Sequence, residues 1–205
     1  MTLSGIVLAG GKSRRFGSDK ASADLLGKPL LQWVVSALEG PCDEVVVVRA
    51  RNQPLPAVGA SIPIRMADDL YDGLGPLAGL VAGLAVATGD FCFAVSTDVP
   101  LLRPALVELL ARRARAADAV CPDVEGFMQP LVAVYRRGAC LPAFRRAVEA
   151  GQLKITAAYA GLRVDVVNEE DVRTADPDLW SFRNANTPAA LGEIAALIES
   201  RRLVP

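Results

Sequence analysis

The chain opens with SGIVLAGGKSRRFGSDK (residues 4–20), an apolar run that passes directly into a glycine-rich, basic loop. Residues 4–9 are typical of a buried β-strand that ends in a glycine turn. The loop glycines, Gly10, Gly11 and Gly17, permit tight backbone turns in which amides point at an anion. Four cations share this loop and match the charge of a triphosphate: Lys12, Arg14, Arg15 and Lys20. The segment therefore predicts a strand and loop that bind phosphate, and a solvated basic turn is the alternative.

Two familiar phosphate motifs fit this loop poorly. A P-loop requires Gly, four residues and then Gly-Lys-Ser/Thr. Gly11-Lys12-Ser13 is present, but the leading position holds Ile6, inside the strand. The dinucleotide fingerprint requires Gly-x-Gly-x-x-Gly, whereas here the first two glycines are adjacent. Both interpretations are weakened but stay open.

Downstream of the loop, apolar strand patterns alternate with helical ones. We expect strands at 44–48, 62–66, 91–96, 119–122, 130–135 and 163–167, and helices at 29–38, 76–86, 104–116 and 141–150, before a last helix capped by Thr187 with Pro188 in its first turn. This alternation predicts a Rossmann-like three-layer α/β/α sandwich with a mostly parallel central sheet. Ligands in such sheets bind at the carboxyl ends of the strands.

The helical pattern at 76–86 contains an unusual glycine spacing. Gly75, Gly79 and Gly83 recur every four residues and so share one face. Each interior glycine costs a helix about 1 kcal/mol relative to alanine. Close packing on a strand, or close approach of a ligand to the backbone, must offset that cost.

Acidic residues follow several of the predicted strands. Asp98, in Thr97-Asp98-Val99-Pro100, ends the apolar strand 91–96 and faces the expected ligand crevice. It is a natural Mg²⁺ ligand, because Mg²⁺ prefers one or two carboxylates together with substrate phosphates. A turn or cap aspartate is the alternative.

Two further acidic groups are candidates of lower rank. Asp68, Asp69 and Asp72 follow the predicted strand 62–66, where Asp68 is our choice for a second metal or nucleoside contact and a polar turn is the alternative. Glu169, Glu170 and Asp171 are typical of a solvated loop.

Composition limits the chemistry available to the chain. The 205 residues contain no histidine, which excludes Ser-His-Asp and Cys-His catalysis and His-based zinc sites. A formal net charge of −1 favours neither nucleic acid nor a membrane as partner. The N-terminal apolar run has no basic flank and no segment is long enough to span a bilayer, so we expect a cytoplasmic protein. Four widely spaced cysteines indicate buried free thiols: Cys42, Cys92, Cys121 and Cys140.

Taken in order, several segments resemble the molybdenum cofactor guanylyltransferase (MobA-type) family of nucleotidyltransferases. The opening block, Leu8 to Lys20, resembles the family signature, and on its own it is typical of the wider superfamily. The remaining matches, in chain order, are Gly27-Lys28-Pro29-Leu30, Gly75-Pro76-Leu77-Ala78-Gly79-Leu80, Thr97-Asp98-Val99-Pro100, Gln129-Pro130-Leu131 and Asn184-x-Asn186-Thr187-Pro188. The resemblance covers nearly the whole chain.

This resemblance implies that GTP and molybdopterin, with or without molybdenum, give the guanine dinucleotide cofactor and pyrophosphate. Leu8, Ala9, Gly10 and Gly11 would then contact the nucleotide, with Asp68. Lys20 and Arg15 would act on the phosphates, Asp98 would bind Mg²⁺, and Asn184 and Asn186 would lie near the pterin acceptor. Residues 1–205 would form one domain with a nucleotide-binding half (1–100) and an acceptor-binding half (101–205). Proteins that insert the cofactor, or molybdoenzymes, would be partners.

One departure from the family pattern concerns the base. Family members can carry a nucleotide-contacting Asn after the second strand, where this chain has Val48-Arg49-Ala50-Arg51. Either Asn52 substitutes or the contact is absent.

Three other functions remain as alternatives. Another nucleotidyltransferase, acting on molybdopterin with CTP or on a sugar phosphate, would bind its nucleotide through the same type of loop. Gly11 and the late Asn-x-Asn-Thr-Pro favour guanine. A nucleotide-binding module without catalysis would not need Asp98. A dinucleotide-dependent dehydrogenase lacks both its glycine fingerprint and an acidic residue at the end of the second strand.

Overall fold

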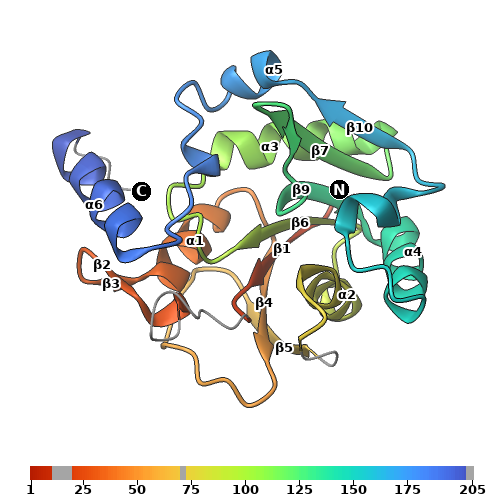
Figure 1. The fold of residues 1–205 in the computed structure, drawn as a ribbon, viewed down its shortest axis with the longest axis horizontal. Helices are drawn as coiled ribbons and strands as arrows, with labels where there is room; N and C mark the ends of the chain where they lie inside the picture. Colours follow the sequence, from red (N-terminus) through yellow and green to blue (C-terminus); the bar gives the residue numbers. More distant parts are fainter. Residues whose placement is uncertain (11–19, 70–72, 202–205) are drawn as a thin grey trace.

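The structure is a computed structural model that describes residues 1–10, 20–69 and 73–201. Within these ranges, an eight-stranded sheet crosses the middle of the molecule in the order β10-β7-β9-β6-β1-β4-β5, with β8 paired to β7 (Figure 1). Its strands are β1 (Leu3–Leu8), β4 (Glu44–Ala50), β5 (Ile64–Asp69), β6 (Phe91–Ser96), β7 (Ala119–Val124), β8 (Phe127–Met128), β9 (Val132–Arg136) and β10 (Val164–Val167). A separate two-stranded hairpin is formed by β2 (Asp24–Leu25) and β3 (Lys28–Pro29).

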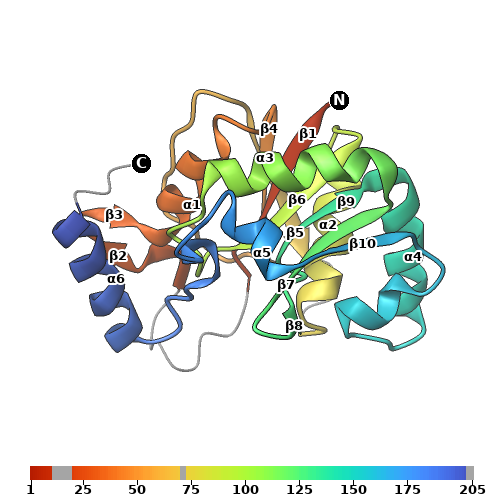
Figure 2. The same cartoon turned by 90° about the horizontal axis from the view of Figure 1, so that it is seen from above.

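Helices cover both faces of this sheet. They are α1 (Leu30–Leu38), α2 (Pro76–Val86), α3 (Pro104–Arg113), α4 (Arg137–Glu149) and α5 (Glu169–Arg173), whereas α6 (Pro188–Arg201) lies beside the β2–β3 hairpin. The part of the chain that the structure describes also contains four 3₁₀ turns: η1 (Lys20–Ser22), η2 (Ala114–Ala116), η3 (Ile155–Tyr159) and η4 (Trp180–Phe182). Figure 2 shows α3 along one side of the sheet, with α2 and α4 on the other.

The sheet is mostly parallel, as the sequence predicts. β5, β4, β1 and β6 pair in parallel in that order, and β10 is parallel to β7. β9 runs antiparallel to both β6 and β7. The carboxyl ends of β1, β4, β5, β6 and β7 therefore lie at one edge of the sheet.

Alternating side chains of the strands build two cores. On one face, Val7, Val47 and Val95 pack with α1 and α3. On the other, Ile6 and Val48 pack with α2 and α4. A third, smaller cluster holds α6 against the β2–β3 hairpin and contains both tryptophans, Trp33 and Trp180. The three-layer α/β/α sandwich is thus confirmed.

The glycines of α2 are explained by contact with the sheet. A Cβ on Gly83 would lie 2.5 Å from Ile6 Cγ2, and one on Gly79 would lie 3.2 Å from Leu8 Cδ2. These two positions allow the helix to approach β1 and β4 closely, which offsets their propensity cost. Gly75 differs, because it is the N-cap with φ 83° and has open space around its Cα.

Several local predictions need correction. β5 extends to Asp69, so Asp68 and Asp69 end that strand and do not follow it. α4 begins at Arg137, before the predicted start at residue 141. The acidic trio at 169–171 forms the first turn of α5 and not a loop, because the Asn168 side chain accepts a hydrogen bond from the Asp171 amide and so caps the helix.

Other predictions are confirmed. Thr187 caps α6, since its hydroxyl accepts a hydrogen bond from the Ala190 amide at 3.1 Å. All four cysteines are buried free thiols. No helix within the described ranges combines the length and apolar character needed to cross a membrane.

Candidate active site

An ion pair joins two predicted site residues at the carboxyl edge of the sheet. Lys20 Nζ lies 2.9 Å from Asp98 Oδ2, and both side chains are less than a fifth exposed. Lys20 opens η1, whereas Asp98 follows β6, 78 residues later in the chain. The sheet therefore brings a cation and a carboxylate into contact where ligands of such folds bind.

The backbone around Asp98 fixes the direction of its side chain. The Thr97 amide donates to the Leu8 carbonyl, which ties this turn to β1. The Val99 amide donates back to the Ser96 carbonyl and closes the turn. The Ser96 hydroxyl donates to Asp98 Oδ1, so each carboxylate oxygen of Asp98 has one partner.

The segment 184–186 reaches the same place from the far end of the chain. The amide of Ala185, which is fully buried, donates to the Asp98 carbonyl at 2.8 Å. Asn184 and Asn186 flank it and are exposed. Asn186 Oδ1 accepts a hydrogen bond from Lys20 Nζ at 2.6 Å. Lys20, Asp98 and Asn186 thus form one cluster, which we call the lysine–aspartate centre.

The backbone at 8–10 is held by neighbouring strands. The amides of Ala9 and Gly10 both donate to the Val48 carbonyl, at 2.7 and 3.1 Å. A Cβ on Gly10 would lie 3.0 Å from the Ala50 nitrogen, so only glycine fits comfortably there. These amides already have partners inside the fold, and the nucleotide contacts of Leu8, Ala9 and Gly10 stay predictions.

Asp68 lies apart from the lysine–aspartate centre. Its carboxylate accepts a hydrogen bond from Arg49 Nε at 2.8 Å, and both side chains are partly exposed. β5 and β6 are separated by β4 and β1, which puts Asp68 on the order of 14 Å from β6. Any contact that Asp68 makes must therefore involve a different part of a ligand.

Arg49 lies in the segment where the family pattern can carry a nucleotide-contacting Asn, and here its side chain is bound within the fold. Besides Asp68, it donates from Nη1 to the Gln53 carbonyl, at 3.3 Å. Asn52 has φ 61° in the turn that follows β4, which Asn tolerates well. Its contact with a base is untested.

Several predicted residues lie outside the described ranges. Gly11 and Arg15 belong to the segment 11–19, together with the other loop cations Lys12 and Arg14, and Asp72 belongs to the segment 70–72.

The side chains around Asp98 suit a metal that keeps ligands from its substrate. Within the described ranges, no group of three or more His, Cys, Asp or Glu side chains gathers to hold a metal ion. A hard cation at Asp98 would therefore need oxygen ligands from a bound phosphate. That is the mode preferred by Mg²⁺, which binds few carboxylates and keeps substrate oxygens and water.

Sequence reasoning missed two polar residues at this edge. Gln53 bridges β4 to the first glycine turn, because Nε2 donates to the Ala9 carbonyl and Oε1 accepts from the Ala50 amide. Asp123, the penultimate residue of β7, has a buried carboxylate oxygen. For Asp123 the available signal was that of Asp98, an acidic residue at the end of an apolar strand.

Comparison with known proteins identifies consistent relatives. A family model described as a MobA-like NTP transferase domain matches residues 5–166. The chain is 37% identical over 203 residues to the molybdenum cofactor guanylyltransferase of Desulfosudis oleivorans, covering 98% of each chain. It is 35% identical to a probable molybdenum cofactor guanylyltransferase of Chloroflexus aggregans, covering 97% of this chain and 96% of the relative.

Solved structures agree with this picture. Molybdopterin-guanine dinucleotide biosynthesis protein A from Archaeoglobus fulgidus superposes with a TM-score of 0.77 at 28% identity, covering 96% of this chain and 99% of that one. The 2-C-methyl-D-erythritol 4-phosphate cytidylyltransferase of Thermus thermophilus shares the fold, with a TM-score of 0.72 at 19% identity and coverage of 97% and 100%.

Proposed function

The chain belongs to the MobA-like NTP transferase family, and on that premise we propose that it transfers GMP from GTP to molybdopterin, forming molybdopterin guanine dinucleotide and pyrophosphate. The relatives named molybdenum cofactor guanylyltransferase support this choice of nucleotide and acceptor. Mg²⁺ is the proposed cofactor. Cofactor-inserting proteins or molybdoenzymes are the proposed recipients of the product.

One observation carries the proposal: the lysine–aspartate centre joins residues from the start, middle and end of the chain. Lys20 comes from the proposed nucleotide-binding half, Asp98 follows the central strand β6, and Asn186 comes from the proposed acceptor-binding half. A group transfer needs donor and acceptor to meet at one point. This cluster is the proposed meeting point of the nucleotide and the acceptor.

Each residue of the lysine–aspartate centre has a proposed role that follows from its charge and its hydrogen-bonding groups. Lys20 donates to the phosphates of the nucleotide and stabilises charge on the departing pyrophosphate, together with Arg15. Asn186 accepts from Lys20 through Oδ1, so its amide nitrogen is left to donate to the acceptor. Asn184, beside it, contributes a second amide on the same exposed segment. Leu8, Ala9, Gly10, Gly11 and Asp68 are the proposed contacts to the rest of the nucleotide.

Asp98 is the proposed metal ligand. When bound, Mg²⁺ would neutralise and orient the α-phosphate. In this structure the Asp98 charge is met by Lys20, and Ser96 keeps the carboxylate turned toward the sheet edge. Asp98 can accept a cation when Lys20 turns to the phosphates.

No general base is needed for this reaction. The attacking group is the terminal phosphate of the acceptor, which is ionised at neutral pH. The chain contains no histidine to serve as a base. The barrier is therefore electrostatic, and positive charge and positioning carry the catalysis.

The test is pyrophosphate release measured with GTP, CTP, ATP and UTP in turn, with and without molybdopterin, in the presence of Mg²⁺. Release with GTP that depends on the pterin supports the proposal. Release with CTP instead would indicate the cytidylyl alternative. Nucleotide binding without release under any condition would indicate a binding module.

A further inference from the structure

We infer that Asp123 is a specificity-determining residue that accepts hydrogen bonds from the amidine edge of a 2-amino-4-oxopyrimidine ring, the edge shared by a pterin and a guanine. The inference rests on the proposed function and deepens it. Asp123 is the penultimate residue of β7, in the half of the chain proposed to bind the acceptor. We therefore expect the ring to be that of the pterin acceptor.

The Asp123 carboxylate has an unpaired buried oxygen. Asp123 Oδ1 is buried and has no hydrogen-bond partner. Within the described ranges, no other buried side-chain nitrogen or oxygen lacks a partner. Burial of a charged or polar oxygen without a partner is unfavourable, and native proteins rarely tolerate it without a reason. Asp123 as a whole is only partly buried, so its carboxylate can be reached from the sheet edge, and a ligand that donates to Oδ1 would supply that reason.

The direction of β7 brings Asp123 to the edge of the sheet that carries the Asp98 turn. β7 is parallel to β6, since each runs antiparallel to β9 between them. The end of β7 therefore lies at the same edge as the Asp98 turn, two strands away, or about 10 Å. In Figure 2, β8 projects from β7 at the edge toward which β1 and β6 run.

The Asp123 side chain lies on the face of the sheet that α2 and α4 cover. Val120 and Val124 pack on the side of α1 and α3, whereas Cys121 packs on the side of α2 and α4. Because side chains alternate along a strand, Asp123 lies on the face of Cys121. Its cross-strand partner, Met128, packs against that same apolar cluster. The carboxylate thus lies beside the end of an apolar core cluster, where a flat heteroaromatic ring with a polar edge can place its apolar part next to Met128.

The strand end is also rigidly held. Glu125 and Gly126 form the tight turn of the β7–β8 hairpin, with φ values of 54° and 78°. The Gln129 amide donates to the Pro122 carbonyl at 2.8 Å, and the Tyr135 hydroxyl donates to the Pro130 carbonyl at 2.6 Å. Tyr135 is in turn 2.9 Å from the Tyr159 hydroxyl. Asp123 is therefore placed by a fixed frame, as a specificity residue requires.

The chemistry of the ligand follows from the acceptor-only character of a carboxylate. Two carboxylate oxygens match two adjacent N–H donors, as in bidentate pairs. The ring N3–H and the 2-amino group of a pterin present two such donors, and the corresponding N1–H and 2-amino group of guanine do the same. A 2,4-dioxo ring presents one donor fewer and an oxygen that would repel the carboxylate.

The experiment compares the wild-type chain, Asp123→Asn and the control Glu149→Gln, which makes the same acid-to-amide change on an exposed residue of α4. KM is measured separately for molybdopterin and for GTP, with melting temperature alongside. We expect Asp123→Asn to raise the KM for molybdopterin at least tenfold, with the KM for GTP within twofold. We also expect its melting temperature to be unchanged or higher, because an unpaired buried charge is removed.

Each other outcome overturns the inference. An unchanged KM for molybdopterin would remove Asp123 from acceptor recognition. A rise in the KM for GTP alone would assign the carboxylate to guanine and overturn the assignment to the pterin. A lower melting temperature with both KM values unchanged would make Asp123 a structural residue. Failure of the wild-type chain to release pyrophosphate would instead refute the proposed function itself.

Discussion

Lys20 stands between the two halves of the site, because one ammonium donates to both Asp98 and Asn186. Charge-assisted contacts of this kind stabilise a developing anion more strongly than a diffuse cationic patch does. We predict that Lys20→Ala lowers kcat for transfer by about 10²-fold or more. Lys12→Ala, in the same basic loop, should lose far less.

Steady-state rates of both variants check this prediction, with circular dichroism as the test of fold. Equal losses in the two variants would mean that the loop binds phosphate only through its summed charge. In that case the pairing of Lys20 with Asp98 would have no catalytic meaning.

At the level of the element, α2 depends on two glycines for its close packing against the sheet. A Cβ at Gly83 would lie 2.5 Å from Ile6, whereas one at Gly192, within α6, would meet open space. We predict that Gly83→Ala destabilises the fold by about 1–3 kcal/mol through overpacking, despite the better helix propensity of alanine. Gly192→Ala should stabilise by about 0.5–1 kcal/mol.

Urea denaturation of the two variants measures both effects against the wild type. Stabilisation by Gly83→Ala would show that α2 can shift away from β1 at no cost. The glycine spacing would then have to be explained by the ligand.

The elements also show what the sequence can and cannot specify. β6 and α2 match their predicted bounds, because an apolar strand and a proline at the helix start are local signals. The two-residue strands β2, β3 and β8 carry no periodicity to detect. α5 is short, but its signals are local, namely the Asn168 cap and the i,i+4 ion pair of Glu169 with Arg173, so a helix was predictable there. Lys20 and Asp98, in contrast, were each named as candidates from the pattern of their own segments.

The contacts of the site beyond those two residues are tertiary. Lys20 and Asn186 are 166 residues apart, and no local pattern predicts their hydrogen bond. The separation of Asp68 from the lysine–aspartate centre follows from strand order, which places β4 and β1 between β5 and β6. Such facts require the assembled sheet.

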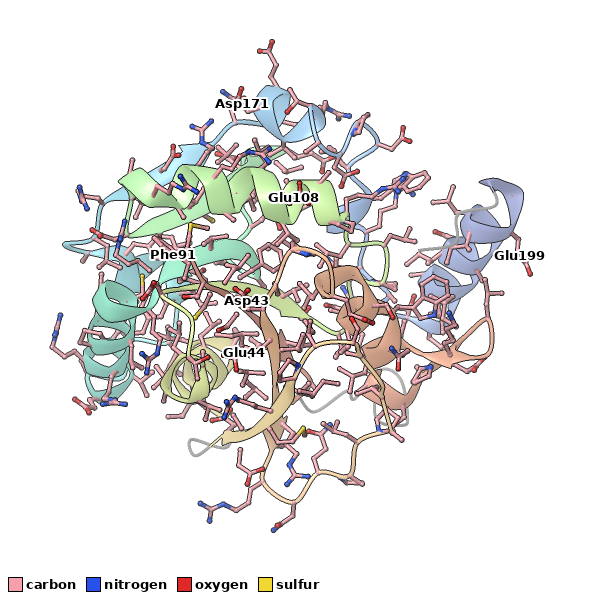
Figure 3. All side chains as sticks on the ribbon, turned by 180° about the vertical axis from the view of Figure 1, so that it is seen from behind. Asp43, Glu44, Phe91, Glu108, Asp171 and Glu199 are labelled. Atoms are coloured by element: carbon pink, nitrogen blue, oxygen red, sulfur yellow. The ribbon has the colours of Figure 1, made fainter. Side chains whose placement is uncertain are left out.

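At the scale of the whole molecule, the edge of the sheet opposite the site is tied together by Glu44. Figure 3 shows Glu44 and Asp43 on the side facing away from the view of Figure 1. Glu44 is 4% exposed and accepts hydrogen bonds from Ser4, from the Thr88 amide and hydroxyl, and from Arg65. Burial by itself would raise the pKa of Glu44, but these donors outweigh it and lower the pKa from 4.5 to about 2.

This shift predicts how stability depends on pH. Because the pKa of Glu44 is lower in the folded state, its contribution is complete above pH 4.5 and is lost as the pH falls toward 2. The contribution is on the order of 3 kcal/mol at neutral pH. Glu44→Gln should therefore be destabilised at pH 7, and its difference from the wild type should shrink steadily between pH 5 and pH 2.

Urea denaturation at a series of pH values tests this, with the exposed Glu149→Gln as the control. A constant difference between Glu44→Gln and the wild type across this range would show that the carboxylate charge plays no part.

The central claim is that GMP is transferred at the lysine–aspartate centre. The most direct measurement follows GTP radiolabelled at its α-phosphate during incubation with molybdopterin and Mg²⁺. We predict that the wild-type chain moves the label into the pterin dinucleotide, and that Asp98→Ala, folded to the same melting temperature within a few degrees, moves none. Full label transfer by Asp98→Ala would show that the transfer takes place elsewhere or without Asp98.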